Sequence, residues 1–180
     1  ILETKNNIDS DFCKSVTIHD AISDLCYDDF SIYTEKQKYL KKPIGKYQEQ
    51  MRNGNESLQN HILHNHKPLT LDRISRIKSG NNWESLDEKN KIKSVHSGAY
   101  GRMEWDEQSA TITTRFDTPS GGRFIHPTLN RNITIREAAR IQSFSDDFIF
   151  YGNKTSICKQ IGNAVPPKLG EFLGYLIKNI

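Results

Sequence analysis

Residues 134–144 have the sequence TIREAARIQSF, and this stretch decides how the fold is organised. Thr134 is followed three residues later by Glu137, which is the spacing of a capping box. In that arrangement each side chain accepts a hydrogen bond from the backbone N–H of the other residue. Ala138 and Ala139 leave one flank thin enough for close packing. The stretch therefore predicts a short, closely packed helix that begins after Thr134.

Two arginines, Arg136 and Arg140, lie one turn apart on this predicted helix and project together. Such a pair can hold phosphate groups, or it can bind internal carboxylates and carbonyls and so lock neighbouring loops. The helix is short and alanine-faced, and Asp146 and Asp147 follow it closely along the chain. We therefore favour the structural role, with the capping-box pair and both arginines forming one structural motif.

Residues 160–180, QIGNAVPPKLGEFLGYLIKNI, end the chain. Pro166 and Pro167 are tolerated in the first turn of a helix. Apolar residues follow at helical spacing, namely Leu169, Phe172, Leu173, Leu176, Ile177 and Ile180. This stripe predicts a terminal helix that is buried against another surface. Gly162 and Asn163 predict a tight polar turn before that helix, suited to an anionic group.

A β-branched run at residues 109–116, SATITTRF, predicts a strand. Alternation places Ile112 and Phe116 on a core face, with Thr111 and Arg115 on the opposite face. Hydroxyl groups and a cation on that second face can contact the phosphate oxygens of a duplex. An ordinary exposed strand face is the alternative.

The glycine pair Gly121 and Gly122 follows this run. Together with Pro119 it predicts a strand-to-strand loop whose backbone can approach a partner closely. Arg115 and Arg123 flank the loop with guanidinium groups that can bridge guanine O6 and N7 or clamp phosphates. A glycine turn with two solvated arginines is the alternative.

The first half of the chain contains weaker helix signals. VTIHDAISDL at residues 16–25 predicts a short helix with Thr17 as N-cap and Asp20 in a capping-box position. The polar, lysine-rich region after it predicts loops and one irregular helix around Lys46–Arg52.

The next helix signal is LTLDRISRIKSG at residues 69–80. It predicts an amphipathic helix capped by Thr70 or Asp72 and ended by Gly80. NNWESLDEKNKIKS at residues 81–94 then predicts a turn and another short helix.

His61, His64 and His66 form the one ligand-like cluster in the sequence. Their spacing matches no structural zinc pattern with cysteines, and the chain has no HExxH helix. We therefore expect a polar turn before the next helix, and no metal site.

Composition excludes a membrane role, because hydrophobic residues make up 35% of the chain and no apolar run approaches a membrane span. The sequence starts without a methionine or a signal-peptide pattern, so we expect an internal start.

Cys13, Cys26 and Cys158 are odd in number and lie far apart. They indicate neither a disulfide framework nor a thiolate zinc site, and we expect a reducing, cytoplasmic setting.

Charge is unevenly distributed along the chain. Residues 1–29 carry seven acids and two bases, whereas residues 30–180 carry 23 bases and 15 acids. A net charge of +8 over the longer span suits a polyanion such as DNA, although a solvated lysine-rich surface is the alternative.

Three blocks together carry a family resemblance: EWDEQSATITTRF (104–116), FIHPTLNRNITIREAARIQSFSDDF (124–148) and QIGNAVPP (160–167). In order and spacing they resemble the C-terminal region of DNA cytosine-5 methyltransferases. REAARIQSF resembles the ninth conserved motif of that family and QIGNAVPP the tenth, and the variable stretch before them resembles its target-recognition domain. Ser145 stands where many members have proline.

The resemblance implies which residues contact cofactor and DNA. Asn163, Ala164 and Val165 would line the site of S-adenosylmethionine. Thr111 and Ile112 match the Thr-Leu-like dipeptide of target-recognition regions. The other residues of the predicted DNA contact are Arg115, Gly121, Gly122 and Arg123.

The resemblance also identifies parts that this chain does not contain. The family uses the cysteine of a Pro-Cys motif as nucleophile, a Glu-Asn-Val motif and a glycine-rich cofactor turn. None of these occurs in the sequence, and no cysteine follows a proline. Cys158 as a nucleophile is less favoured than Cys158 as a small apolar core residue. We therefore expect no catalytic residue in this chain, and an isolated fragment without activity.

The expected fold is α+β. Residues 1–29 would end a catalytic-domain segment, residues 30–150 would form a small mixed target-recognition domain with short strands, and residues 151–180 would return to a Rossmann-like domain. The expected partners are duplex DNA and a missing N-terminal catalytic half or separate catalytic subunit, with self-association of the fragment possible. A non-catalytic DNA-binding subunit or regulator is the alternative, whereas a nuclease is disfavoured because Asp87 and Glu88 are adjacent and not spread over strand ends.

Overall fold

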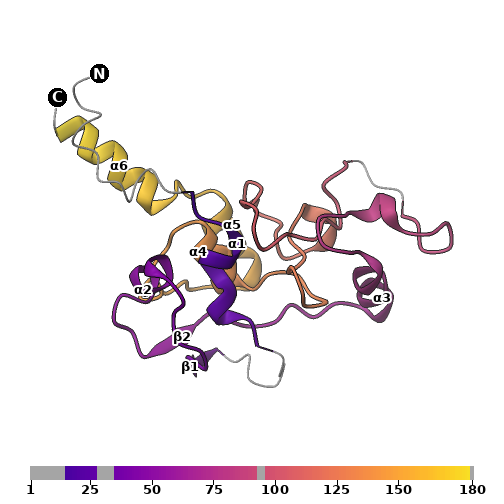
Figure 1. Ribbon diagram of the computed structural model, residues 1–180, viewed down its shortest axis with the longest axis horizontal. Helices are drawn as coiled ribbons and strands as arrows, with labels where there is room; N and C mark the ends of the chain where they lie inside the picture. The colour runs from indigo at the N-terminus through magenta and orange to yellow at the C-terminus, as the bar shows by residue number, and fades with distance from the viewer. Residues whose placement is uncertain (1–14, 28–34, 93–95, 179–180) are drawn as a thin grey trace.

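A computed structural model describes residues 15–27, 35–92 and 96–178 (Figure 1). Short helices and irregular segments dominate it. The α-helices are α1 (Ile18–Ile22), α2 (Lys46–Arg52), α3 (Pro68–Arg76), α4 (Ile135–Ile141), α5 (Lys154–Gly162) and α6 (Pro167–Lys178). Single 3₁₀ turns are η3 (Ser23–Leu25), η5 (Trp83–Ser85) and η6 (Pro119–Gly121).

The sheet in the described residues is a single antiparallel pair of strands. β1 (Lys36–Lys38) pairs with β2 (Ser57–Gln59), with Lys36 opposite Gln59 and Lys38 opposite Ser57. The fold therefore mixes helices with one small sheet, in agreement with the expected α+β class.

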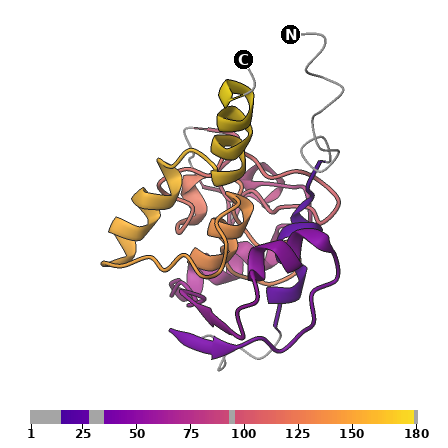
Figure 2. The same cartoon turned by 90° about the vertical axis from the view of Figure 1, so that its left-hand side faces the viewer.

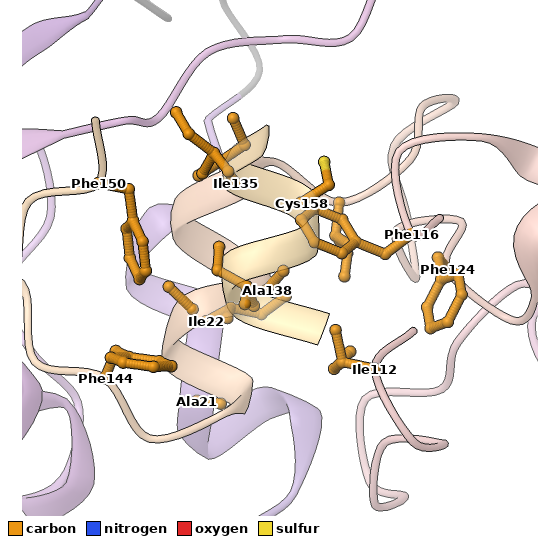
Figure 3. Packing of buried hydrophobic residues seen from close by; sticks show 14 of the residues in the cluster. Ala21, Ile22, Ile112, Phe116, Phe124, Ile135, Ala138, Phe144, Phe150 and Cys158 are labelled. Atoms are coloured by element: carbon orange, nitrogen blue, oxygen red, sulfur yellow. The ribbon is translucent and has the colours of Figure 1, made fainter. Parts of the chain in front are cut away.

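The main core surrounds α4. Side chains from α1, α4 and α5 and from the segment between Ile112 and Phe124 pack together there, as Figure 3 shows for Ile22, Ala138 and Cys158. Residues from all three predicted segments of the chain thus share one core. A second, smaller cluster lies at the end of α3, on the opposite side of the molecule from α2 and the sheet (Figure 1).

Helix α6 projects away from this core (Figures 1 and 2). None of its residues is buried, and Leu169, Leu173 and Ile177 of the predicted apolar stripe are 47%, 46% and 73% exposed. Over the described ranges, no helix has both the length and the apolar character needed to cross a membrane.

Local sequence signals predicted several elements well. α1 begins after Thr17, whose side chain and that of Asp20 form the expected capping box. α2 has the predicted bounds, and α6 begins at the second proline of the pair. α3 differs at both ends. Pro68 occupies the first turn and Lys67 is the N-cap, so neither Thr70 nor Asp72 caps it, and the helix ends at Arg76, before the predicted stop at Gly80.

The predicted strand at residues 109–116 is wrong. This segment has no regular secondary structure and ends in turns, where the backbone N–H of Thr118 bonds to the Arg115 carbonyl. Ile112 and Phe116 are buried as expected, but the segment packs on α5 and pairs with no other strand. Alternation placed Ile112 and Phe116 inside and Thr111 and Arg115 outside correctly, but Ala110, on the same predicted face as Ile112, is exposed. Alternation also carries no information about a hydrogen-bonding neighbour.

Helix α5 was missed. Asn153 caps it by accepting a hydrogen bond from the backbone N–H of Ser156 at 2.9 Å, and Ile157 and Ile161 are spaced for one buried face. That N-cap asparagine ahead of two isoleucines four residues apart was the available signal.

Candidate functional site

The capping box at the start of α4 is complete and buried. The backbone N–H of Glu137 donates to Thr134 Oγ1 at 3.1 Å, and the backbone N–H of Thr134 donates to Glu137 Oε2 at 2.8 Å. Both residues are fully buried, so water cannot replace either bond. The box therefore determines where α4 begins.

Glu137 also neutralises a buried arginine. Arg131 donates to both carboxylate oxygens of Glu137 at 2.7 Å. Burial alone would raise the pKa of Glu137, but the charge and hydrogen bonds of Arg131 hold this pKa below its usual range. Glu137 is therefore a buried carboxylate that is ionised in the folded protein.

Arg140 joins two carboxylates in the core. Its guanidinium donates to Asp24 at 2.6 Å and to the two oxygens of Asp146 at 2.9 and 2.6 Å. Burial lowers the pKa of Arg140, but the two carboxylates outweigh burial and raise it overall. Asp146 is thus a predicted partner, whereas Asp147 lies on the surface and bonds to Ser145 and Asn53. Asp24 was missed, although it is the second acid of the DAISDL helix.

Arg136 holds loops through their carbonyl oxygens. It donates to the carbonyls of Gln59, Ser145 and Phe148 at 2.8, 3.1 and 2.9 Å. Neither Arg136 nor Arg140 is exposed to solvent, so neither is available to a phosphate group. The structural role of this arginine pair follows directly from these contacts.

His61 extends the capping box into the core. Its Nε2 lies 3.1 Å from the Leu25 carbonyl, which only accepts, so Nδ1 accepts from the Thr134 hydroxyl at 2.8 Å. Burial lowers the pKa of His61 to about 4, and the ring is neutral at pH 7. In the part of the chain that the structure describes, no three His, Cys, Asp or Glu side chains are placed to hold a metal ion.

Replacing Thr134 by alanine should lower the free energy of unfolding by about 2 kcal/mol, because it removes both the helix cap and the partner of buried His61. Denaturant unfolding measures this loss. Thr17→Ala is the matched control, since Thr17 forms the same box on α1 at a less buried position. Equal losses in the two variants would mean that the His61 contact contributes nothing.

The segment predicted to contact DNA presents only some of its side chains. Thr111 and Arg115 are exposed, whereas Ile112 is 3% exposed and packs in the main core. The Ile112 side chain therefore cannot contact DNA directly, because it faces the core. Ile112 instead anchors the residues on either side of it.

The two loop glycines make internal contacts. A Cβ at Gly121 would lie 2.0 Å from the Arg115 carbonyl oxygen, and one at Gly122 would lie 2.5 Å from the Phe124 ring. Arg123 donates to the Gly80 carbonyl at 2.9 Å. These glycines allow the loop to fold on itself as a 3₁₀ turn, and the predicted strand-to-strand loop is wrong because residues 109–116, which precede it, form no strand.

The residues of the predicted cofactor wall follow α5 directly. Asn163 is the C-cap of α5 and is exposed, Ala164 packs against the main core, and Val165 is 64% exposed. Gly162 packs against the predicted DNA segment, since a Cβ there would lie 2.5 Å from Thr113 C and Thr114 N. The end of α5 thus lies between the predicted cofactor-binding residues, which follow it, and the predicted DNA-binding segment, which packs against it.

A cavity of about 640 Å³ lies beside this wall. Its apolar lining comes from Val16, Tyr47, Ile141, Pro166, Leu169 and Phe172. Asn163, Ala164 and Val165 do not line it. The apolar side of α6 therefore borders the cavity at its first turns and is open to solvent further along.

A further buried arginine, Arg102, organises the second cluster. Its guanidinium donates to the carbonyls of Ile74 and Ile77 at 2.8 and 2.6 Å, and to those of His126 and Leu129 at 2.8 and 2.9 Å. It therefore joins the end of α3 to the loop before α4. No sequence signal separates this arginine from a surface one.

The protein-family comparison decides the identity of the chain. The model for C-5 cytosine-specific DNA methylases matches residues 14–179. The chain belongs to the C-5 cytosine-specific DNA methylase family.

Curated relatives of this methylase chain come from bacteria, plants and a mammal. It is 34% identical over 175 residues to the type II methyltransferase M.DdeI of Desulfomicrobium norvegicum, covering 87% of this chain and 41% of the relative. It is also 34% identical over 189 residues to DNA (cytosine-5)-methyltransferase 1B of Oryza sativa subsp. japonica, covering 92% of this chain and 12% of the relative. The methylase chain thus spans less than half the length of these relatives.

A solved structure from E. coli, described as a prophage-encoded DNA modification methyltransferase, has a similar fold. Its TM-score is 0.67 at 22% identity, and the match covers 93% of the methylase chain and 48% of the other chain. At this identity the likeness concerns the fold alone.

Cys158 of the methylase chain lies in the core beside Phe116 (Figure 3). It is fully buried, and burial raises the pKa of its thiol to about 12. A nucleophilic cysteine needs a low pKa and access to substrate. Cys158 has neither property, and it serves as a small core residue.

Proposed function

We propose that this chain is the DNA-recognition and closing portion of a DNA cytosine-5 methyltransferase. That enzyme would transfer a methyl group from S-adenosylmethionine to C5 of cytosine in duplex DNA. The observation that carries the proposal is the contact of Gly162 with Thr113 and Thr114 in a member of this family. This contact joins an exposed arginine segment to the residues that the family motif assigns to the cofactor.

The residues after α5 fit one wall of a cofactor site. Asn163 offers an exposed amide at the end of a helix, and Val165 offers an exposed apolar side chain beside it. S-adenosylmethionine, when bound, supplies the methyl group. These residues would orient it, while Ala164 anchors the wall in the core.

The rest of the enzyme would pack against α6. Leu169, Leu173 and Ile177 leave an apolar stripe open to solvent, and a stripe of this kind is normally covered in a complete protein. The nucleophile and the other cofactor residues would come from that catalytic half. It would take the target base out of the stack while this portion holds the duplex.

A reconstitution assay tests this function. The chain is mixed with the upstream half of a family member, and transfer of a radiolabelled methyl group to duplex DNA is measured. We expect transfer only when both halves are present. DNA binding by the chain without transfer in the folded mixture would instead support a non-catalytic DNA-binding subunit.

Replacing Arg115 by alanine should weaken binding to duplex DNA and lower the slope of log K against log salt by about one, because one phosphate contact is lost. Arg123→Ala should have a smaller effect, since Arg123 already donates to the Gly80 carbonyl. Fluorescence anisotropy over a salt series measures the DNA affinity and the salt slope of each variant. Lys178→Ala, at the exposed end of α6, is the control for loss of one positive charge. An Arg115→Ala slope equal to that of the unmodified chain would remove Arg115 from the interface.

A further inference from the structure

Within residues 15–27, 35–92 and 96–178, no strand pairs with the segment that carries Arg115, so its position depends on other contacts. Its side chains point into the main core at Ile112 and Phe116, and Ile157, Cys158 and Ile161 of α5 belong to the same core (Figure 3 shows Ile112, Phe116 and Cys158). The segment therefore lies along one helix.

At the last residue of α5 the helix meets the segment backbone to backbone. Gly162 is the last residue of α5, and a Cβ there would lie 2.5 Å from Thr113 C and Thr114 N and 2.7 Å from the Thr113 carbonyl oxygen. Separations under about 3 Å are not compatible with a real Cβ, and the obstructing atoms are backbone. Any side chain at position 162 must push the segment outward.

The beginning of α5 contacts the other end of the segment. Lys154 Nζ lies 3.2 Å from Asp117 Oδ2, and the Asp117 side chain is 13% exposed. The two contacts lie eight residues apart on α5 and bracket Arg115, whose side chain remains exposed between them.

We propose that α5 positions the DNA-binding segment, with Gly162 and the Asp117–Lys154 ion pair as its two attachment points. Gly162 is a positioning residue that acts through Arg115, and it makes no contact with DNA itself. Because Asn163 follows Gly162 directly, the same contact fixes the cofactor wall relative to the DNA-binding segment. This inference rests on the proposed function for the role of Arg115 in DNA binding.

The test is a double-mutant cycle on duplex DNA of mixed sequence. Gly162→Ala should weaken binding about three- to tenfold and lower the salt slope by about one, as Arg115→Ala does. The double variant should lose little beyond either single variant, because both changes remove the same contact. Gly170→Ala is the matched control, since a Cβ at Gly170 meets nothing within 4 Å.

The outcomes separate this inference from the proposed function. An Arg115→Ala variant with an unchanged slope would overturn the DNA assignment. If Arg115→Ala lowers the slope while Gly162→Ala does not, or if the two effects add, the positioning role is wrong. A purely structural loss would lower the fraction of folded chain, measured by circular dichroism, without changing the slope.

A second variant covers the case in which Gly162→Ala does not fold. Asp117→Asn breaks the other attachment at a partly exposed ion pair. We expect about twofold to fivefold weaker binding, even though a negative charge has been removed near the DNA. Tighter binding with a steeper salt slope would overturn the proposal, because it would mean that Asp117 acts by charge alone. Asp72→Asn, in an ion pair on α3, is the control.

Discussion

Replacing Glu137 by alanine is expected to cost about 3–5 kcal/mol of stability, because it leaves the Arg131 guanidinium buried without its carboxylate. Glu137 accepts two hydrogen bonds from Arg131 and one from the backbone N–H of Thr134, and its side chain is fully buried. The total free energy of unfolding of a folded domain is about 5–15 kcal/mol. The variant should therefore be largely unfolded at 37 °C or melt far below the unmodified chain, as circular dichroism would record.

Glu137→Gln is the matched control for shape. It keeps an oxygen for the backbone N–H of Thr134 but removes the charge that balances Arg131. We expect an intermediate loss. A Glu137→Ala variant as stable as the unmodified chain would contradict the view that this pair holds the start of α4.

Mild acid is expected to unfold the protein, because three neutral histidines are buried. Burial lowers the pKa of His61 to about 4 and those of His64 and His126 to about 3. Below about pH 6.5 each of them takes up a proton in the unfolded chain but not in the folded one, so stability falls as pH falls. Each histidine lowers the free energy of unfolding by about 1.4 kcal/mol for each pH unit of acidification, and the three together lower it by about 4 kcal/mol per pH unit.

The window for this loss runs from about pH 6.5 down towards the folded pKa values. Glu137 adds to it only at lower pH, since its depressed pKa stabilises the folded state above the ordinary carboxylate range and is lost below it. Urea unfolding at a series of pH values measures the slope. His64→Phe, at a ring that packs on Phe116, should reduce the slope by about one third. Equal stability at about pH 6.5 and about pH 4.5 would contradict the neutral, buried state of these rings.

Local signals predicted the starts of α1, α4 and α6 but not those of α3 and α5, because a cap or a first-turn proline acts on residues only a few positions apart. The capping boxes at Thr17 and Thr134 and the start of α6 at Pro167 are of this kind. The strand at residues 109–116 failed for the opposite reason. A strand needs a hydrogen-bonded neighbouring strand, and in the described residues this segment packs on α5 and on the core and pairs with no strand.

Buried charge was predicted only in part. Asp146 lies six residues from Arg140 and was within reach of a sequence argument, whereas Asp24 lies 116 residues away. Arg102 donates to four backbone carbonyls. Every residue has a backbone carbonyl, so residue identity cannot show which ones accept from an arginine. His61 was predicted to lie in a polar turn before α3, although it supports the cap of α4.

The sequence by itself determined the family of this protein, the capping motif of α4 and the amphipathic character of α6. These depend on residue identity at short spacing, where one side chain reaches its partner within a helical turn. Only the tertiary structure decided that Asp24 lies beside Arg140, that the segment containing Ile112 packs on a helix and forms no strand, and that Gly162 contacts the Arg115 segment from α5. Those outcomes depend on which surfaces meet across long separations in sequence, and packing of backbone against backbone is invisible in the identity of the residues.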